Sequence, residues 1–440
     1  MALSTQPYKG ARDFYPEDKR KQKYMFAVMR RVVESFGYQE YDAPVVEPIE
    51  LYMSKTSEEI VLEQTFVFND RGGRTVTLRP EMSPTVSRMV AGKRQELSYP
   101  LRWYSIPNLW RYERPQAGRL REHWQLNVDI FGVAGIEGDH EIILIADKIL
   151  KAFGAKSDDY TIKLNSRQLL NWFLLENFQL DQSQIQPLIR LIDKKDKITE
   201  KEFKDAASVM LSAAQQQSGV LSQLIELLNV KTMGELPLVA QQHPAAKQLQ
   251  QLLTMLISSG VHSAAFDPSL MRGFDYYTDI VFEVFDNNPE NNRSMFGGGR
   301  YDGLVGAFGV EPVPTVGFGM GDVTLQNFLE GHKLMPVFEP ETDAAVILIG
   351  NVYESAQQTL KTLRKEGLRL AVDSTNRKVD AQIKSAVKAG IPYAIFIGEH
   401  ELSVQRFNLK NLKTGEEKEM ALERVVSMLA ARHKPHNDLV

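Results

Sequence analysis

The sequence predicts an α+β domain with a helical segment inserted in it, followed by a small α/β domain. The α+β prediction comes from residues 111–132, where apolar residues alternate after an arginine-rich turn, as in a strand with one buried face. Residues 165–260 are instead rich in Leu and Gln, with apolar residues at helical spacing. Residues 344–398 alternate as β-α-β-α-β, which indicates a small, mostly parallel sheet.

Composition places the chain among ordinary globular proteins. Its 440 residues give an expectation of about three domains, and 43% hydrophobic with 25% charged residues is typical of a chain with a real core. No apolar run approaches the roughly 18 residues of a membrane span, so we expect a soluble, cytoplasmic protein with no membrane partner. The absence of Cys excludes disulfides and thiolate zinc sites. A net charge of −4 argues against a general polyanion binder, although local patches could still dock nucleic acid.

The chain before the arginine-rich stretch predicts helices and short strands. Apolar residues at helical spacing indicate a first helix, which Gly37 ends. Prolines confine the next, extended segment to a sheet edge or a strand end. A hairpin then turns at Arg71-Gly72-Gly73. The predicted elements are, in order, a helix over 18–36, an extended segment over 38–48, hairpin strands over 66–70 and 74–78, and a helix from 85.

The elements after residue 100 follow from the same periodicities. A strand leads into a hairpin whose strands carry inward polar groups, and the helical insertion separates this part from a later return of strand patterning. A Pro-punctuated linker at 334–340 precedes the last domain. The predicted elements are a strand over 101–110, the hairpin in 111–132, a helix over 139–153, sheet patterning from 272–277, a strand over 280–285, a helix ending at 329, strands over 344–350, 368–372 and 393–398, and helices over 354–366 and 379–389.

The arginine-rich turn and the glycine-rich strands carry the chemical signals. Arg111, Arg114, Arg119 and Arg121 surround a Pro-Gln-Ala-Gly turn, and guanidinium groups can hold phosphates bidentately. There is no P-loop motif, and the glycines at 297–299 and 317–321 do not have the dinucleotide-binding spacing. Glycines on strands more often mark the close approach of another backbone or a flat ligand. No Gly-x-Ser-x-Gly elbow or metal-spaced His pair occurs, which excludes the common nucleophilic and zinc hydrolases.

Each candidate residue, taken alone, also has a purely structural interpretation. The basic turn could be a solvated loop, and an acidic residue on a strand could simply be a satisfied polar group. The residues concerned are Asp129 as that strand carboxylate, Tyr276 and Tyr277 as one core and one surface aromatic, Arg272 as an ion-pair arginine, Glu81 as a partner at a helix N-terminus, and Arg377 with Lys378 as a solvated face. Only their occurrence together favours a functional site.

Five motifs in one chain resemble the histidyl-tRNA synthetases, which are class II aminoacyl-tRNA synthetases. They are TLRPEMSPT at 77–85, RYERPQAGRLREHWQLNVDIFG at 111–132, LMRGFDYYTDIVFE at 270–283, GGGRYDGLV at 297–305 and PTVGFGMGD at 314–322. The resemblance implies a catalytic domain with a six-stranded antiparallel sheet and flanking helices, a helical insertion and a C-terminal α/β anticodon-binding domain. It also implies a homodimer whose interface includes residues 38–48. The expected boundaries are 1–164 and 263–332 for the catalytic domain, 165–262 for the insertion, 333–342 for a linker and 343–440 for the anticodon-binding domain.

The resemblance further implies a histidine-tRNA ligase, which forms histidyl-adenylate from L-histidine and ATP with Mg²⁺ and transfers histidine to the 3′ end of tRNA(His). Catalytic roles fall by similarity on Arg272, Arg111 and Gln125. Histidine would be bound by Glu81, Met82, Ser83, Arg111, Gln125, Asp129, Arg272, Tyr276 and Tyr277. ATP would be bound by Arg111, Glu113, Arg119, Arg121 and Asp322, and tRNA by Gln116, Arg119, Arg377 and Lys378. No metal site built by the protein alone is expected.

The implied roles agree with what these residue types can do. The imidazole of histidine needs an acceptor for its N–H and a polar partner for its other nitrogen, which Asp129 and Tyr277 would supply. Arg111 and Arg272 would meet the α-phosphate, where charge develops in the transition state. A guanidinium suits this task because it does not deprotonate.

The chain departs from the commoner family pattern at three positions, and a rival function follows from one of them. Asp129 stands where many relatives have Glu, Leu120 where Tyr is frequent, and Thr324 where the last motif usually has Arg. Lack of that arginine favours a non-catalytic regulatory partner of a short ATP phosphoribosyltransferase. Such subunits typically lack the C-terminal domain and the two arginines that correspond to Arg111 and Arg272. This chain has both features, so the sequence favours the ligase. Pseudo-synthetase modules fused to kinases are a third possibility, but kinase motifs do not occur here.

Overall fold

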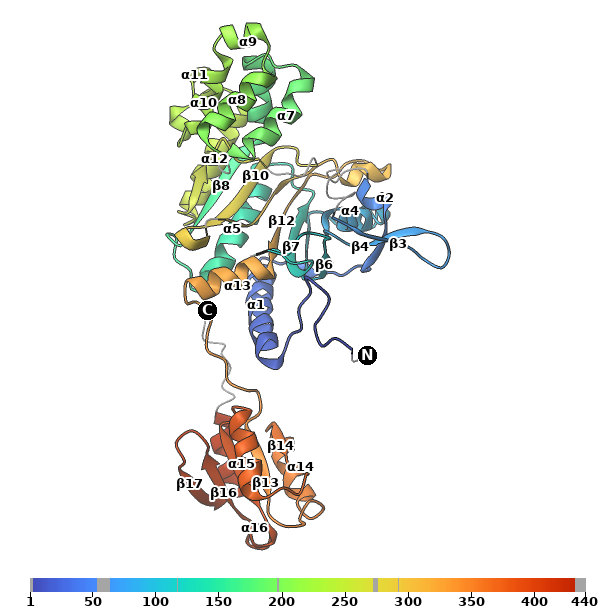
Figure 1. Cartoon of the computed structure of the whole chain (residues 1–440), viewed down its shortest axis with the longest axis vertical. Coiled ribbons are helices and arrows are strands. Elements are labelled where there is room, and N and C mark those ends of the chain that lie inside the picture. The colour runs from blue at the N-terminus through green and yellow to red at the C-terminus, as the bar shows by residue number, and fades with distance from the viewer. Residues whose placement is uncertain are drawn as a thin grey trace. The chain divides into compact units, whose positions relative to one another are not determined.

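A computed structural model of the chain divides into two compact units (Figure 1). The first comprises residues 1–15 and 21–335, and the second comprises residues 336–440 together with 16–20. Each unit is considered by itself below. The structure describes residues 3–53, 64–116, 118–195, 198–271, 276–291 and 293–431.

The first unit is organised around one large, mostly antiparallel sheet. Its strand order is β1-β5-β7-β12-β11-β10-β8-β9, with β6 paired to β7 off this path. The six strands from β5 to β8 in this order are antiparallel, as the sequence predicted, and the two outermost strands pair parallel to their neighbours. The strands are β1 Gln39–Glu40, β5 Leu101–Ser105, β6 Asn108–Trp110, β7 Glu122–Phe131, β8 Tyr160–Ser166, β9 Ala264–Phe266, β10 Ile280–Asp286, β11 Ser294–Arg300 and β12 Thr315–Gly321.

The predicted single strand over 101–110 is wrong, because it is two strands. Both β5 and β6 pair with β7, and the break between them falls at Ile106 and Pro107. Proline has no N–H to donate to a ladder, so the pairing is interrupted there. The carbonyl of Pro107 still accepts the N–H of Gln125 at 3.1 Å, which keeps the two strands in line along β7.

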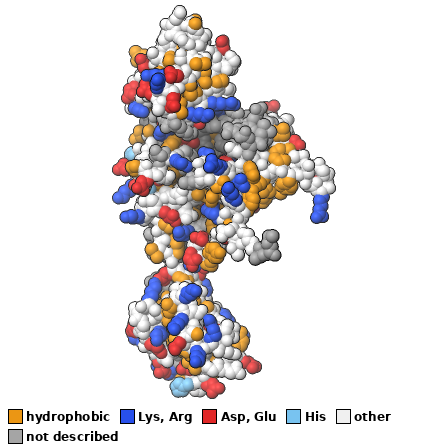
Figure 2. Space-filling model, viewed as in Figure 1, with side chains coloured by type: hydrophobic (Ala, Val, Ile, Leu, Met, Phe, Trp, Pro, Cys, Tyr) orange, Lys and Arg blue, Asp and Glu red, His pale blue; other side chains and the backbone are white. Residues whose placement is uncertain are grey.

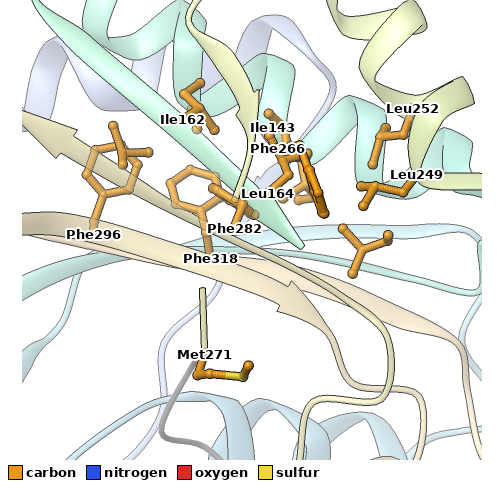
Figure 3. Packing of buried hydrophobic residues seen from close by; sticks show 14 of the residues in the cluster. Ile143, Ile162, Leu164, Leu249, Leu252, Phe266, Met271, Phe282, Phe296 and Phe318 are labelled. Atoms are coloured by element: carbon orange, nitrogen blue, oxygen red, sulfur yellow. The ribbon is translucent and has the colours of Figure 1, made fainter. Parts of the chain in front are cut away.

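One face of this sheet is the core of the unit. Leu126, Val128 and Ile130 of β7 lie on that face and are buried. Phe282 and Phe318 meet edge to face there, with ring centroids 6.2 Å apart, and Figure 3 shows them beside Ile162 and Leu164 of β8. The helices that bury apolar residues in this core include α1 Pro16–Ser35, α5 Ile136–Ala152, α12 Pro244–Ser258 and α13 Asp322–Gly331.

Helix boundaries follow from local chemistry. Helix α1 begins at Pro16, two residues before the predicted start, because proline is tolerated in the first turn. It ends before Gly37, which has a φ of +81°, a conformation that favours glycine and allows a close C-terminal turn. A short helix, α2 Glu50–Met53, and α4 Ser83–Gly92 complete this part, beside a three-stranded sheet formed by β2 Val46–Pro48, β4 Thr75–Leu78 and β3 Phe66–Asn69.

The helical insertion lies between β8 and β9. Its helices are amphipathic, and Leu224, Leu249 and Leu252 are among the residues they bury. Thr199 and Glu202 form a reciprocal cap at the start of α8, which fixes that boundary. The elements are α6 Arg167–Trp172, a π-helical turn Phe173–Asn177, α7 Gln182–Ile192, α8 Glu200–Met210, α9 Ala213–Gln217, α10 Val220–Asn229, a 3₁₀ turn Met233–Glu235, α11 Leu238–Gln241 and α12.

The second unit has a five-stranded sheet of order β14-β13-β15-β16-β17. Its first three strands are parallel, as predicted, and β13 is buried along its whole length because side chains pack on both faces. Residues after 398 add an antiparallel pair that periodicity did not predict. The elements are β13 Ala344–Leu348, α14 Gln357–Lys365, β14 Leu370–Val372, α15 Val379–Lys388, β15 Tyr393–Ile397, α16 Glu399–Val404, β16 Arg406–Asn411, β17 Glu417–Ala421 and α17 Leu422–Ala430. Across the described part of both units, we find no helix that is long and apolar enough to cross a membrane.

Candidate functional site

A cleft of about 400 Å³ lies on the sheet face opposite the core. Alternate residues of each strand point into it, since successive side chains of a strand face opposite sides. On β7 these are Gln125, Asn127 and Asp129, whereas the residues between them lie in the core. The turn after β6, the start of α4 and Tyr276 with Tyr277 complete the lining. Figure 2 shows Lys and Arg side chains gathered over the middle of the first unit, beside an apolar area.

Glycines form the floor of the cleft and leave room for the polar side chains of β7. Gly317 is opposite Asp129 in the β12–β7 register. A Cβ at Gly317 would clash with Oδ1 of Asp129, and one at Gly319 would clash with the amide of Gln125. On β11, Gly298 does not line the cleft and is paired with Phe318, and a Cβ there would clash with the carbonyl of Gly317. The strand glycines were expected to mark the close approach of another backbone or a flat ligand. In the structure, both neighbouring side chains and backbone approach them closely.

Asp129 is a buried carboxyl at one end of the cleft. Burial raises its pKa to about 7, and the hydrogen bond that Tyr301 donates to its Oδ1 lowers the pKa only partly. The rings of Tyr276, Tyr277 and Tyr301 pack against one another, with centroids 5.0 to 6.4 Å apart. The arrangement is an apolar, aromatic wall around one acidic group that can accept a hydrogen bond.

Glu81 and Ser83 stand near the start of α4 and close the same end. Glu81 is buried, and Tyr276 donates its hydroxyl to Glu81 Oε2 at 3.0 Å. Ser83 Oγ lies 3.5 Å from the same hydroxyl, and Met82 between them is buried. The N-cap residue of α4, Met82, makes no side-chain cap, and the described hydrogen bond of Glu81 comes from Tyr276. The cleft thus holds two acidic groups around a space suited to a cation and a ring.

Arg111, Glu113 and Arg119 form a charged group at the opposite end. Arg111 Nε donates to the carbonyl of Pro80 at 2.9 Å, which fixes the guanidinium. Glu113 lies 3.9 Å from both Arg111 and Arg119. Arg119 is 64% exposed, so its side chain can reorient toward a ligand, whereas Arg111 is 21% exposed and held in place. His123 lies beside them on β7, and burial together with the nearby Arg111 lowers its pKa to about 3.

Gln125 connects the two ends of the cleft. Its side-chain amide donates to Asn127 Oδ1 at 2.9 Å, and Asn127 donates back to the carbonyl of Gln125 at 3.0 Å. Thr324, where the family commonly has arginine, lines the cleft but directs its hydroxyl to the carbonyl of Met295 at 2.7 Å. The methyl group of Thr324 lies 3.6 Å from where a Cβ on Gly118 would be, which places the arginine-rich turn over this residue.

Other predicted site residues lie outside the cleft lining. Arg121 donates to Tyr8 at 2.8 Å and stacks on Tyr112, 4.1 Å from the ring centroid. Asp322 is buried, pairs with Arg12 and accepts the N–H of Trp124. Gln116 is exposed in the turn. In the second unit, Arg377 pairs with Asp373, and Lys378 is exposed at the start of α15. The predicted residue Arg272 lies outside the described residues.

Sequence reasoning missed several residues of the cleft. His123 and Asn127 share the face of β7 that carries Gln125 and Asp129, so strict use of the strand period would have found them. Glu283 lies opposite Gly297 in the β10–β11 register and also lines the cleft. That position depends on which strands pair, and one sequence does not give the pairing. Tyr301 belongs to the motif at 297–305, but no role in the site was assigned to it.

The chain matches two family models, one for each unit. Residues 10–323 match the model described as histidyl-tRNA synthetase, and residues 343–432 match the model described as anticodon binding domain. The first match alone covers well over half of the chain.

Similar proteins and structures agree with these matches. The chain is 44% identical over 415 residues to a histidine-tRNA ligase of Leptospira biflexa, covering 93% of this chain and 94% of that one. It is 37% identical over 411 residues to a histidine-tRNA ligase of Haloarcula marismortui, with the same coverage. Among solved structures, histidyl-tRNA synthetase from Nostoc sp. PCC 7120 has a TM-score of 0.81 at 22% identity, covering 98% of this chain and all of that one. A structure from Bacillus halodurans, titled as an ATP phosphoribosyltransferase regulatory subunit/histidyl-tRNA synthetase, has a TM-score of 0.73 at 22% identity, covering 90% of this chain and all of that one. These two likenesses show the fold.

The raised pKa of Asp129 makes a prediction about stability and pH. The folded protein holds this proton up to about pH 7, whereas the unfolded chain releases it near pH 4, so stability falls as pH rises through that window. Asp129→Asn removes this loss of stability. We expect the difference in thermal unfolding midpoint between the variant and the wild type to shift in favour of the variant from pH 5 to pH 8. The shift corresponds to a few kcal/mol of unfolding free energy. Tryptophan fluorescence measures this, because all four Trp lie in the first unit.

Asp139 provides a control for this comparison. Its pKa is also raised by burial, to about 6, but it pairs with the buried Arg300 at 2.5 Å. Asp139→Asn leaves that cation uncompensated and should destabilise the unit at both pH values. A relative midpoint for Asp129→Asn that is the same at pH 5 and pH 8 would contradict the prediction.

Proposed function

The chain belongs to the histidyl-tRNA synthetase family, and on that premise we propose that it is a histidine-tRNA ligase. It activates L-histidine with ATP to give histidyl-adenylate and pyrophosphate, and then transfers histidine to the 3′ end of tRNA(His). The observation that carries this proposal is that one cleft is lined both by Glu81 and Asp129 and by Arg111 and Arg119. A substrate with a cationic amine and a polar ring fits the acidic pair, and a triphosphate fits the arginines.

Histidine is bound at the Glu81 and Asp129 end. Glu81 and Ser83 meet the ammonium group, with Tyr276 holding the Glu81 carboxylate in position. Asp129 accepts a hydrogen bond from one imidazole nitrogen, and Tyr277 offers its hydroxyl to the other. Asp129 is one methylene shorter than the Glu found in many relatives. The fixed bond from Tyr301 and the absence of a Cβ on Gly317 position this shorter carboxyl.

The arginines act on the phosphates. A carboxylate oxygen of histidine attacks the α-phosphorus of ATP, the bond to the bridging oxygen breaks, and pyrophosphate leaves with the bonding electrons. Arg111 is anchored by the carbonyl of Pro80 and stays charged, so it stabilises the negative charge that develops on the α-phosphate. We assign the same role to Arg272 from its place in the motif alone. Gln125 holds the histidine carboxylate between the two ends.

Mg²⁺ enters this scheme with ATP. Among the described residues, no group of three His, Asp or Glu side chains is arranged to hold a metal ion. Mg²⁺ bound mainly by triphosphate oxygens and water needs only one or two carboxylates, and Glu113 in the cleft would supply one. The ion would offset part of the negative charge of the triphosphate.

The second unit and the turn residues bind tRNA. Residues 343–432 match an anticodon-binding model, and Arg377 and Lys378 stand exposed at one end of α15. Gln116 and Arg119 in the turn meet the acceptor end, since arginine holds phosphate and an amide can read a base edge. We further propose a homodimer that uses residues 38–48, and a cytoplasmic location. The boundaries at 164, 262, 332 and 342 are part of the same proposal.

The regulatory-subunit alternative is not favoured. The chain carries residues 343–432, and its curated relatives are histidine-tRNA ligases over 93% of its length. The only feature in favour of the alternative is Thr324, where arginine is usual.

The first test of this function is histidine-dependent exchange of label between pyrophosphate and ATP. We expect exchange with L-histidine and Mg²⁺ and background rates with the other amino acids, because the acidic end selects an imidazole N–H. Absence of exchange at millimolar histidine, or exchange driven by another amino acid, would reject the assignment.

A second prediction concerns the cation that replaces the missing arginine at position 324. Arg119 faces the cleft and can reorient, whereas Arg121 and Asp322 are engaged elsewhere. Arg119→Ala should therefore raise the KM for ATP by about tenfold or more, with the KM for histidine little changed. Arg114→Ala, in the same turn but outside the cleft lining, serves as the matched control. An equal rise in the KM for ATP in both variants would show that ATP binding depends on the total positive charge of the turn and not on Arg119 in particular.

A third prediction separates the two units. Their apolar cores are distinct, so a chain ending at residue 335 should fold and retain histidine-dependent exchange. Aminoacylation of tRNA(His) by this shortened chain should fall by about two orders of magnitude or more, as expected when a binding module worth several kcal/mol is removed. Loss of exchange to the same extent would mean that the second unit is structural.

A further inference from the structure

The residues just before α1 lie against the outer end of the cleft. The carbonyl of Gly10 accepts the N–H groups of Arg121 and Glu122 at 2.9 and 3.1 Å, so this segment is bonded to the point where the arginine-rich turn enters β7. The ring of Phe14 meets Trp124 edge to face, with centroids 5.1 Å apart. The lead-in is thus joined to the strand that carries the polar side chains of the cleft.

Arg12 in this lead-in reaches a carboxylate 310 positions away in the sequence. Its Nη2 lies 2.7 Å from Oδ2 of Asp322, which is 1% exposed. The guanidinium also stacks on Phe14, 4.8 Å from the ring centroid. A buried carboxylate without a cation is strongly unfavourable. Burial raises the pKa of Asp322, and the guanidinium of Arg12 opposes this shift.

Asp322 in turn joins two walls of the cleft. Its Oδ1 accepts the backbone N–H of Trp124 at 3.0 Å, which ties the first turn of α13 to β7. Neither Asp322 nor Trp124 lines the cleft, but their neighbours on both sides do, namely His123, Gln125, Gly321, Val323 and Thr324. The pair therefore sits directly behind the cleft wall and sets the separation of its two sides.

We propose that Arg12 is a positioning residue for ATP, which acts through Asp322 to hold the wall formed by His123 and Thr324. The inference rests on the proposed function, because this wall lies at the arginine end of the cleft. Thr324 carries no positive charge, and its hydroxyl donates a hydrogen bond to the carbonyl of Met295. Correct spacing between this wall and the arginine-rich turn then lets Arg119 of that turn reach the nucleotide. The charge of Arg12 also contributes, after burial and Arg111, to the low pKa of His123.

The test compares Arg12→Met with Lys21→Met in the exchange assay. Lys21 also joins the N-terminal region to α13, through Glu330 at 2.9 Å, but at the end of that helix away from the cleft. We expect Arg12→Met to raise the KM for ATP by about tenfold or more, with the KM for histidine within about twofold, and Lys21→Met to change neither. Arg12→Lys, which keeps the charge, should recover part of the loss.

The double variant Arg12→Met/Asp322→Asn shows whether Arg12 acts through Asp322. An Asn at 322 carries no charge and can still accept the N–H of Trp124, so the double variant should bind ATP better than Arg12→Met alone. A double variant as impaired as Arg12→Met, an equal rise in both KM values, or the same rise in Lys21→Met would overturn the inference. If thermal melting shows that Arg12→Met is not folded, the comparison is made with Arg12→Lys and the double variant instead. No exchange in the wild-type protein would reject the proposed function instead, whereas normal exchange with an unchanged Arg12→Met would reject only this inference.

Discussion

The antiparallel pairing of β7 with β12 is the constraint on which the rest of the first unit depends. It places Asp129 opposite Gly317 and Gln125 opposite Gly321, so that polar side chains of one strand stand over glycines of the other. The residues between them form the apolar core on the other face. A shift of one residue would exchange the two faces, burying Asp129 and the polar side chains beside it in the core and filling the cleft with apolar side chains. The register thus specifies fold and site together.

Three buried aspartates in this unit have different roles. Asp322 and Asp139 each have an arginine partner within 2.7 Å, and each joins elements that meet beside the cleft. Arg300, the partner of Asp139, also donates to the carbonyls of Val133 and Gly135, and it directly precedes Tyr301. Asp129 differs, because its described hydrogen bond comes from a phenol and leaves its pKa near neutrality. Asp322 and Asp139 therefore stabilise the framework, whereas Asp129 lines the cleft.

Periodicity predicted most elements of the fold, because helices and strands bury one face each. It failed where the chain has a local interruption, as at Pro107, and where no strong alternation marks the strands, as after residue 398. Glu81, Arg111, Gln125 and Asp129, which the motifs singled out, line one cleft, and their roles there stay predictions. Partners that depend on strand pairing or on distant packing, such as Arg12 with Asp322, could not be predicted from a single sequence. That ion pair changes the role expected for Asp322, since both of its oxygens are occupied.

The glycine floor also limits how this cleft can evolve. Because Gly297, Gly317 and Gly319 have no side chain to shorten, any replacement there can only reduce the space above the sheet. New room for a larger amino acid has to come from the strand opposite or from the aromatic wall, where side chains exist that can be trimmed. Space for a larger amino acid can therefore be gained by shortening side chains such as Asp129 and Tyr277, but not by any substitution in the floor.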